Sequence, residues 1–125
     1  MPTRYFTVEE ANALLPNIKP VLGELLERRA RIVRSRNEVT SFLRSGDSDV
    51  GGREASELVQ EFMKMEKLIL KIRSHDIVLK DLNVGLIDFL SERDGREVYL
   101  CWRYGEPKVD FYHELHSGFN GRQHL

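Results

Sequence analysis

Cysteine is nearly absent from this chain of 125 residues, since Cys101 is the only one. A single cysteine cannot form an intramolecular disulfide, which agrees with a reducing compartment. The chain also has no apolar run near the roughly 20 residues that a membrane-spanning helix needs, and residues 1–6 lack the apolar core of a signal peptide. We therefore expect a cytoplasmic protein without a membrane partner.

A surplus of either charge is lacking as well. The 19 lysines and arginines are balanced by 20 aspartates and glutamates, which gives a net charge of −1. The arginines of residues 28–36 spread around the helix expected there, and glutamates three or four positions away offset them. Because no positive field would attract a polyanion, we expect no nucleic-acid partner.

The segment from residue 7 onward has the pattern of a helix. Thr7 and Glu10 have the spacing of a capping box, in which each side chain bonds the backbone N–H of the other residue. Pro16 and Pro20 each remove a backbone donor, so we expect a short first helix, or a kink, before one long helix. Apolar residues then recur at steps of three and four to about Arg44.

A second amphipathic helix is expected after a loop. Residues 45–52 contain three glycines and no periodic pattern, which predicts the loop. From Arg53 to about His75 one apolar seam steps by four and three. Two long helices joined by a short loop pack as antiparallel neighbours, so we expect a hairpin over about residues 8–80. The seam consists of Leu58, Phe62, Met65, Ile69 and Ile72.

After Asp81 the apolar residues alternate with polar ones, which indicates strands. We expect three strands, over residues 85–90, 97–104 and 108–113. Asp94-Gly95 favours a two-residue type I′ turn between the first two strands. The facing pairs that follow are Phe89 with Leu100, Ile87 with Trp102, and Asp88 with Cys101.

The second turn of this sheet contains Pro107 and is expected to have two or four residues. Either length predicts the same two faces, of which the first should pack on the helices. The first face holds Ile87, Phe89, Leu100, Trp102, Val109, Phe111 and His113. The second holds Asp88, Tyr99, Cys101, Arg103, Asp110 and Tyr112.

The expected fold is one α+β domain over residues 1–125, a long antiparallel helical hairpin followed by a three-stranded antiparallel β-meander. The meander and the C-terminal tail occupy about residues 85–125. Strands of this length span roughly 20 to 25 Å, whereas helices of about 25 residues span roughly 38 Å. The uncovered helical stripe predicts a homodimer through the helices, as a four-helix bundle, and the alternative is a monomer with frayed helix tips.

Two regions of the chain resemble the bacterial family called domain of unknown function 2203. They are residues 6–16 (FTVEEANALLP) and a C-terminal group of three segments, 85–89 (GLIDF), 100–106 (LCWRYGE) and 118–122 (GFNGR). The resemblance spans nearly the whole chain, but residues 24–81 match only as generic helix. The resemblance implies a fold similar to that of the family, and it points to the C-terminal segment. It does not imply a reaction.

The first candidate site is a possible divalent metal centre. His113 and His116, with Glu106 nearby in sequence, offer imidazole and carboxylate ligands for zinc, iron or manganese. The helices would supply a further ligand, and Glu61, Glu66 and His75 are available there. The alternative is that His113 is a strand-end residue bonded to a carbonyl and that His116 is a loop residue.

The second candidate is a row of Asp88, Cys101 and Asp110 on the outer sheet face, with Arg103 diagonal to Asp88. Carboxylates on both sides would raise the pKa of the Cys101 thiol, which argues against a nucleophilic cysteine. We favour a polar face with a cross-strand pair between Asp88 and Arg103. Both residues are also possible contacts for an anion or a partner.

The third candidate is the tail around Arg122. The glycines of residues 118–122 can bend the backbone, and Arg122 could then hold a carboxylate or phosphate. We favour the alternative, in which Phe119 and Arg122 anchor the tail to the body or to a second subunit.

No complete catalytic set is present, so the sequence leaves open whether the protein is an enzyme. We expect a non-enzymatic dimeric scaffold or interaction protein that docks a protein partner. The alternative is a metal-binding protein or small metalloenzyme that uses His113 and His116 with a carboxylate. Anion or nucleotide binding at Arg103 and Arg122 is a third interpretation.

Overall fold

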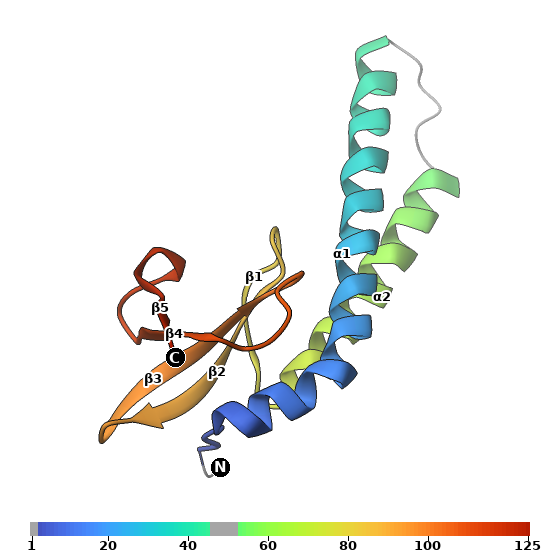
Figure 1. Ribbon diagram of the computed structural model, residues 1–125. Helices are drawn as coiled ribbons and strands as arrows, with labels where there is room; N and C mark the ends of the chain where they lie inside the picture. The colour runs from blue at the N-terminus through green and yellow to red at the C-terminus, as the bar shows by residue number, and fades with distance from the viewer. Residues whose placement is uncertain (1–2, 46–52) are drawn as a thin grey trace.

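The computed structural model describes the backbone of residues 3–45 and 53–125, and the side chains of residues 3–34 and 55–125. The architecture is α+β (Figure 1). Two helices, α1 (Val8–Ser45) and α2 (Arg53–Arg73), lie side by side and run in opposite directions. Among the described residues, neither helix combines the length and apolar character that a membrane crossing requires.

The capping box predicted at the start of α1 is confirmed. The Glu10 N–H donates to Thr7 Oγ1 at 3.1 Å, and the Thr7 N–H donates to Glu10 Oε1 at 3.0 Å. Phe6, just before the cap, donates its N–H to the Leu90 carbonyl at 2.8 Å, and its own carbonyl accepts from Ser91 Oγ at 2.5 Å. The helix therefore begins at a point fixed to the sheet.

Pro16 and Pro20 lie inside α1, which is one continuous helix of 38 residues. The expectation of a separate short helix is therefore wrong. Its alternative, a kink, agrees with Figure 1, where the blue N-terminal part of α1 runs in a different direction from the remainder. A proline ring displaces the carbonyl one turn earlier, which bends a helix without ending it when packing holds both halves.

The second helix ends at Arg73, earlier than the hairpin boundary predicted near residue 80. A turn follows in which Asp76 has a φ of 63°, and the chain then enters strand β1 (Val78–Asp81). The four residues of β1 are too few to show an alternating pattern of their own, which is why they were included in the helix. The loop predicted after α1 lies, except for Ser45, outside the described residues.

The sheet has five antiparallel strands instead of the predicted three, each beside its neighbour in sequence. Its outermost strands, β1 and the two-residue β5, are the ones that the prediction missed. Between them lie β2 (Leu86–Arg93), β3 (Arg96–Arg103) and β4 (Phe111–Glu114), and β5 consists of Gln123–His124.

The register of β2 and β3 is as predicted. Asp94 and Gly95 have φ values of 53° and 77°, as a type I′ turn requires. All three predicted pairs are present: Phe89 with Leu100, Ile87 with Trp102, and Asp88 with Cys101.

The predicted faces of β4 are wrong, because its register is displaced by one residue. Phe111 faces Cys101, His113 faces Tyr99 and Tyr112 faces Leu100. An odd number of residues, 102–110, lies between the paired residues Cys101 and Phe111. The predicted turn of two or four residues would have placed an even number between paired residues, so every side chain of β4 faces the opposite side of the sheet from the prediction. His113 and Phe111 therefore lie on the outer sheet face, and Tyr112 lies on the inner one.

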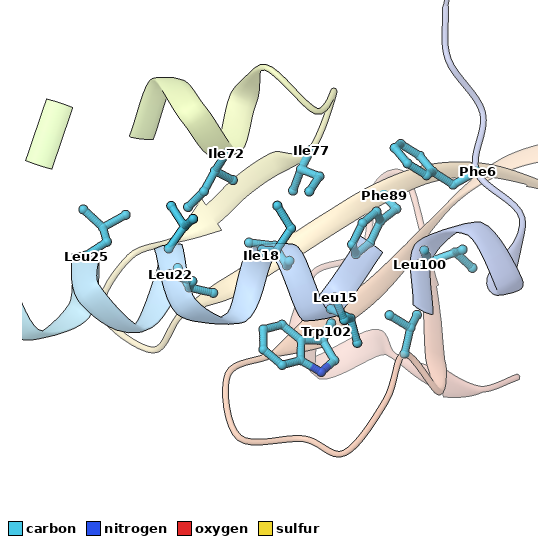
Figure 2. Packing of buried hydrophobic residues seen from close by; sticks show 14 of the residues in the cluster. Phe6, Leu15, Ile18, Leu22, Leu25, Ile72, Ile77, Phe89, Leu100 and Trp102 are labelled. Carbon is cyan, nitrogen blue, oxygen red and sulfur yellow. The ribbon is translucent and has the colours of Figure 1, made fainter. Parts of the chain in front are cut away.

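The hydrophobic core lies between the helices and the inner sheet face (Figure 2). Apolar residues of the first half of α1 pack there against the end of α2 and the centres of β2 and β3. The largest fully buried members are Phe6, Ile18, Leu22, Leu25, Ile72, Ile87, Phe89, Leu100 and Trp102. The distal part of the hairpin extends beyond the sheet in Figure 1.

Candidate functional site

Three side chains with ligand atoms meet on the outer sheet face, which points away from the helices. They are Asp88 of β2, Cys101 of β3 and His113 of β4. Their exposed fractions are 0%, 0% and 1%. One ligand atom from each lies within 4.8 Å of the other two. We call these three residues the outer-face cluster.

The orientation of His113 is fixed at both ring nitrogens. Nδ1 lies 2.8 Å from the Glu114 carbonyl oxygen, which can only accept, so Nδ1 carries a proton. Nε2 lies 3.0 Å from Asp88 Oδ2. A neutral imidazole carries only one N–H, and here it is at Nδ1. The contact between Nε2 and Asp88 Oδ2 therefore requires a second proton, which the imidazole and the carboxyl group share. The other carboxyl oxygen, Oδ1, is buried and has no hydrogen-bond partner within the part of the chain that the structure describes.

The protonation of the cluster is governed mainly by burial. Burial raises the pKa of the Asp88 carboxyl above its usual value, and the neighbouring His113 offsets part of that rise. Burial, followed by the charge of Asp88, raises the pKa of the Cys101 thiol to about 12. The rise had been predicted, although from two flanking carboxylates. Such a thiol is not a nucleophile at neutral pH.

Asp110 does not complete the predicted row, because Phe111 takes the place beside Cys101. The partly buried Asp110 carboxylate lies instead 3.7 Å from Nδ1 of the exposed His124. The predicted pair between Asp88 and Arg103 is also absent, since Asp88 bonds His113, and Arg103 lies 5.9 Å from the Phe119 ring.

The C-terminal tail packs on this same outer face, on the far side of the sheet from the helices in Figure 1. The Arg122 guanidinium lies 3.8 Å from the centroid of the Phe111 ring and 4.6 Å from that of Phe119. It also donates to both Glu106 carboxylate oxygens, at 2.9 and 2.7 Å. Arg122 thus anchors the tail, which agrees with the alternative favoured from the sequence.

The residues predicted as metal ligands are separated in the structure. His113 belongs to the outer-face cluster, whereas His116 is exposed in the turn after β4. Glu106 is occupied by Arg122 and accepts the Arg103 N–H at 2.6 Å. Of the helical residues considered, Glu61 bonds Arg28 at 2.9 Å.

A second feature is an exposed apolar stripe on α2. Its members are Val59, Phe62, Met63 and Leu70, with exposed fractions of 57%, 54%, 56% and 57%. These side chains line a shallow groove together with Met65, Glu66, Ile69 and Arg73. We call the four exposed residues the α2 apolar face. The predicted seam is buried at Met65 and Ile72, but Phe62 is turned outward.

Sequence reasoning found part of the outer-face cluster. The Asp94-Gly95 turn was enough to place Asp88 beside Cys101. His113 was assigned to the inner face, because nothing in the local sequence of residues 104–110 specifies how many residues separate the paired positions. The number of residues in this connection depends on a contact between residues that are far apart in the sequence.

The comparisons with known proteins agree with the resemblance noted in the sequence. Neither the curated proteins nor the solved structures contain a significant match. One family model, described as an uncharacterized conserved protein (DUF2203), matches residues 4–125. Since this match covers nearly the entire chain, the protein belongs to the DUF2203 family.

Proposed function

We propose that the protein is a homodimeric interaction scaffold that self-associates through the α2 apolar face. One observation carries the proposal: four large apolar side chains on a single helix are each more than half exposed. Contiguous exposed apolar surface of this kind is typical of protein interfaces. The occupant to which we commit is a second copy of the same chain.

The charge distribution of α2 supports this occupant. Residues 53–62 carry three glutamates and one arginine, whereas residues 63–73 carry three lysines, one arginine and one glutamate. In an antiparallel pair of α2 helices, the acidic half of one would lie against the basic half of the other. A twofold axis produces this arrangement, because it presents the same patch on both subunits.

The length of the hairpin is a second support. The 38 residues of α1 span about 57 Å at 1.5 Å per residue, and the distal part of both helices extends beyond the sheet in Figure 1. Two such hairpins packed together form a four-helix bundle, which gives each distal part a second helical layer.

Sedimentation velocity at micromolar concentrations tests the proposal. The wild-type protein should show a molar mass twice that of its 14.6 kDa chain. The Phe62→Asp variant should show the mass of a monomer, because dimerisation would bury the aspartate charge in the interface. The matched control is Leu115→Asp, which changes another exposed apolar residue and should remain dimeric. A monomeric wild type, or a dimeric Phe62→Asp protein, would contradict the proposal.

The alternative function, a metal centre built on His113 and His116 with a carboxylate, has less support. His116 is exposed and lies outside the outer-face cluster, and Glu106 is bonded to Arg122.

A further inference from the structure

We propose that the outer-face cluster is a zinc site in which Asp88, Cys101 and His113 are the ligands. The three donors come from three adjacent strands and converge in a buried position, with one ligand atom from each residue within 4.8 Å of the other two. A thiolate, an imidazole and a carboxylate are the three ligand types that proteins use for zinc. A thiolate ligand disfavours magnesium, calcium and manganese.

The spacing of the ligand atoms suits tetrahedral zinc. Bond lengths of about 2.0 to 2.3 Å at tetrahedral angles put neighbouring ligand atoms about 3.3 to 3.6 Å apart. In the structure, Nε2 of His113 and Oδ2 of Asp88 are 3.0 Å apart, and the widest separation is within 4.8 Å. Side-chain movements of roughly 1 Å would bring the three atoms to zinc-binding distances.

His113 has the orientation expected of a metal ligand. Its Nδ1–H donates to the Glu114 carbonyl at 2.8 Å, so Nε2 points into the cluster and offers its lone pair once the proton shared with Asp88 is released. Metal-binding histidines in proteins are usually held in this manner, with the second ring nitrogen bonded to a carbonyl or carboxylate.

One carboxyl oxygen of Asp88 has an environment that a hydrogen-bonded histidine–aspartate pair does not explain. Its Oδ1 atom is buried, and among the described residues no donor lies at hydrogen-bonding distance from it, although the neighbouring Cys101 thiol interacts with the carboxyl group. An unsatisfied carboxylate oxygen in the protein interior carries a substantial desolvation cost. A cation bound between the three donors would remove that cost.

Binding of the ion is balanced in charge. Without zinc, the cluster is neutral overall: the Cys101 thiol keeps its proton, and Asp88 and His113 share one more. Binding of Zn²⁺ to one thiolate, one carboxylate and one neutral imidazole releases these two protons to solvent, and the site remains neutral. A buried site tolerates this exchange because no net charge is added.

The ion would link β2, β3 and β4 beneath the C-terminal tail. Three protein ligands leave the fourth tetrahedral position for a small ligand such as water. Since the three side chains are at most 1% exposed, this position is shielded from bulk solvent. The proposal is independent of dimerisation, because it uses no residue of the α2 apolar face.

Cobalt substitution provides the test. Untagged protein is unfolded with a chelator, dialysed, and refolded with excess Co²⁺, and free metal is then removed. We expect one retained cobalt per chain and a thiolate-to-cobalt charge-transfer band that stoichiometric Zn²⁺ abolishes. Because Cys101 is the only cysteine, such a band reports this residue even without a variant.

The variants locate the other ligands. Cys101→Ser should lose the charge-transfer band, and Asp88→Asn should lose stoichiometric retention of cobalt. His116→Ala is the matched control, since it removes a nearby exposed histidine and should leave both properties unchanged. If wild-type protein that is folded by circular dichroism retains no cobalt, or retains it without the band, the proposal is overturned. It is equally overturned if folded Cys101→Ser keeps the band.

Discussion

Asn12 of α1 and Val109 of the loop before β4 are joined by two hydrogen bonds. The Val109 N–H donates to Asn12 Oδ1 at 2.7 Å, and Asn12 Nδ2 donates to the Val109 carbonyl at 3.2 Å. The same amide nitrogen donates to the Val8 carbonyl at 3.1 Å, within the first turns of the helix. Asn12 thus fixes the loop that sets the register of β4, and with it the position of His113.

Replacement of Asn12 by alanine should therefore be costly. The change leaves the Val109 N–H without its acceptor at a position where Val109 itself is buried. We expect the free energy of unfolding to fall by about 2 kcal/mol, as measured by urea denaturation. Asn17→Ala, an exposed site on the same helix, is the control and should change stability by less than about 0.5 kcal/mol. Equal effects of the two variants would contradict this role.

The tail anchor depends on the planar shape of Arg122 as well as its charge. Arg122→Ala removes both the stacking between two aromatic rings and the ion pair with Glu106, whose shortest N···O distance is 2.7 Å. We expect a loss of about 2 kcal/mol in urea denaturation. Arg122→Lys should recover less than half of it, because an ammonium group has no planar face that can stack between the two aromatic rings.

Arg103→Ala is the matched control for this prediction. Its guanidinium is exposed and lies 5.9 Å from the Phe119 ring, so the expected loss is only about 0.5 kcal/mol. Full recovery of stability in Arg122→Lys would show that charge alone anchors the tail.

Cys101 should be unreactive in the native metal-free protein. With a thiol pKa of about 12, on the order of one molecule in 10⁴ carries a thiolate at pH 8. In the unfolded chain the ordinary pKa of 9.0 allows about one in ten. We expect labelling by a disulfide reagent to be at least ~100-fold slower in buffer with chelator than in urea. Similar rates in the two conditions would show that the thiol is accessible and activated.

Acid should destabilise the protein through three carboxylates that are bonded in the folded state. The pKa values of Glu10, Glu61 and Glu114 lie below their ordinary value of 4.5, because Thr7, Arg28 and Arg96 donate hydrogen bonds to their charged forms. The unfolded chain then binds protons more readily than the folded one. Their stabilising contribution is complete above pH 4.5 and is lost as the pH falls through the lowered folded values.

The Glu61→Gln variant tests this pH dependence. Its stability should decrease less steeply than that of the wild type as the pH falls below 4.5, because one of the three titrating contacts is missing. Thermal denaturation across this range provides the measurement. Glu27→Gln, at an exposed site of α1, should follow the wild-type profile, and a wild-type profile for Glu61→Gln would argue against the contact with Arg28.

Local chemistry was sufficient to predict the helix start and the first hairpin of the sheet. The capping box needs only Thr7 and Glu10, and the type I′ turn needs only Asp94 and Gly95. These features lie within a few residues of sequence, so their geometry follows from backbone preferences that the residue types carry.

The outer-face cluster could not be predicted in full, because His113 depends on a distant contact. The loop that leads into β4 is held by hydrogen bonds to Asn12, which is 97 residues before Val109 in the chain. The burial of Asp88 and Cys101 does not follow from the local sequence for a related reason, since the alternating pattern predicts a polar outer face and gives no sign of the tail that covers it. The tail that packs there is held by Arg122 and Glu106, a pair whose residues are 16 positions apart.

The odd spacing between Cys101 and Phe111 restricts how this chain can change length. If β4 paired one residue away from its present register, Tyr112 would turn toward the cluster and His113 would turn into the apolar core. A shift of two residues would keep both side chains on their present faces. A change in the length of this loop therefore keeps the outer-face cluster together only if the loop absorbs it and Cys101 still pairs with Phe111.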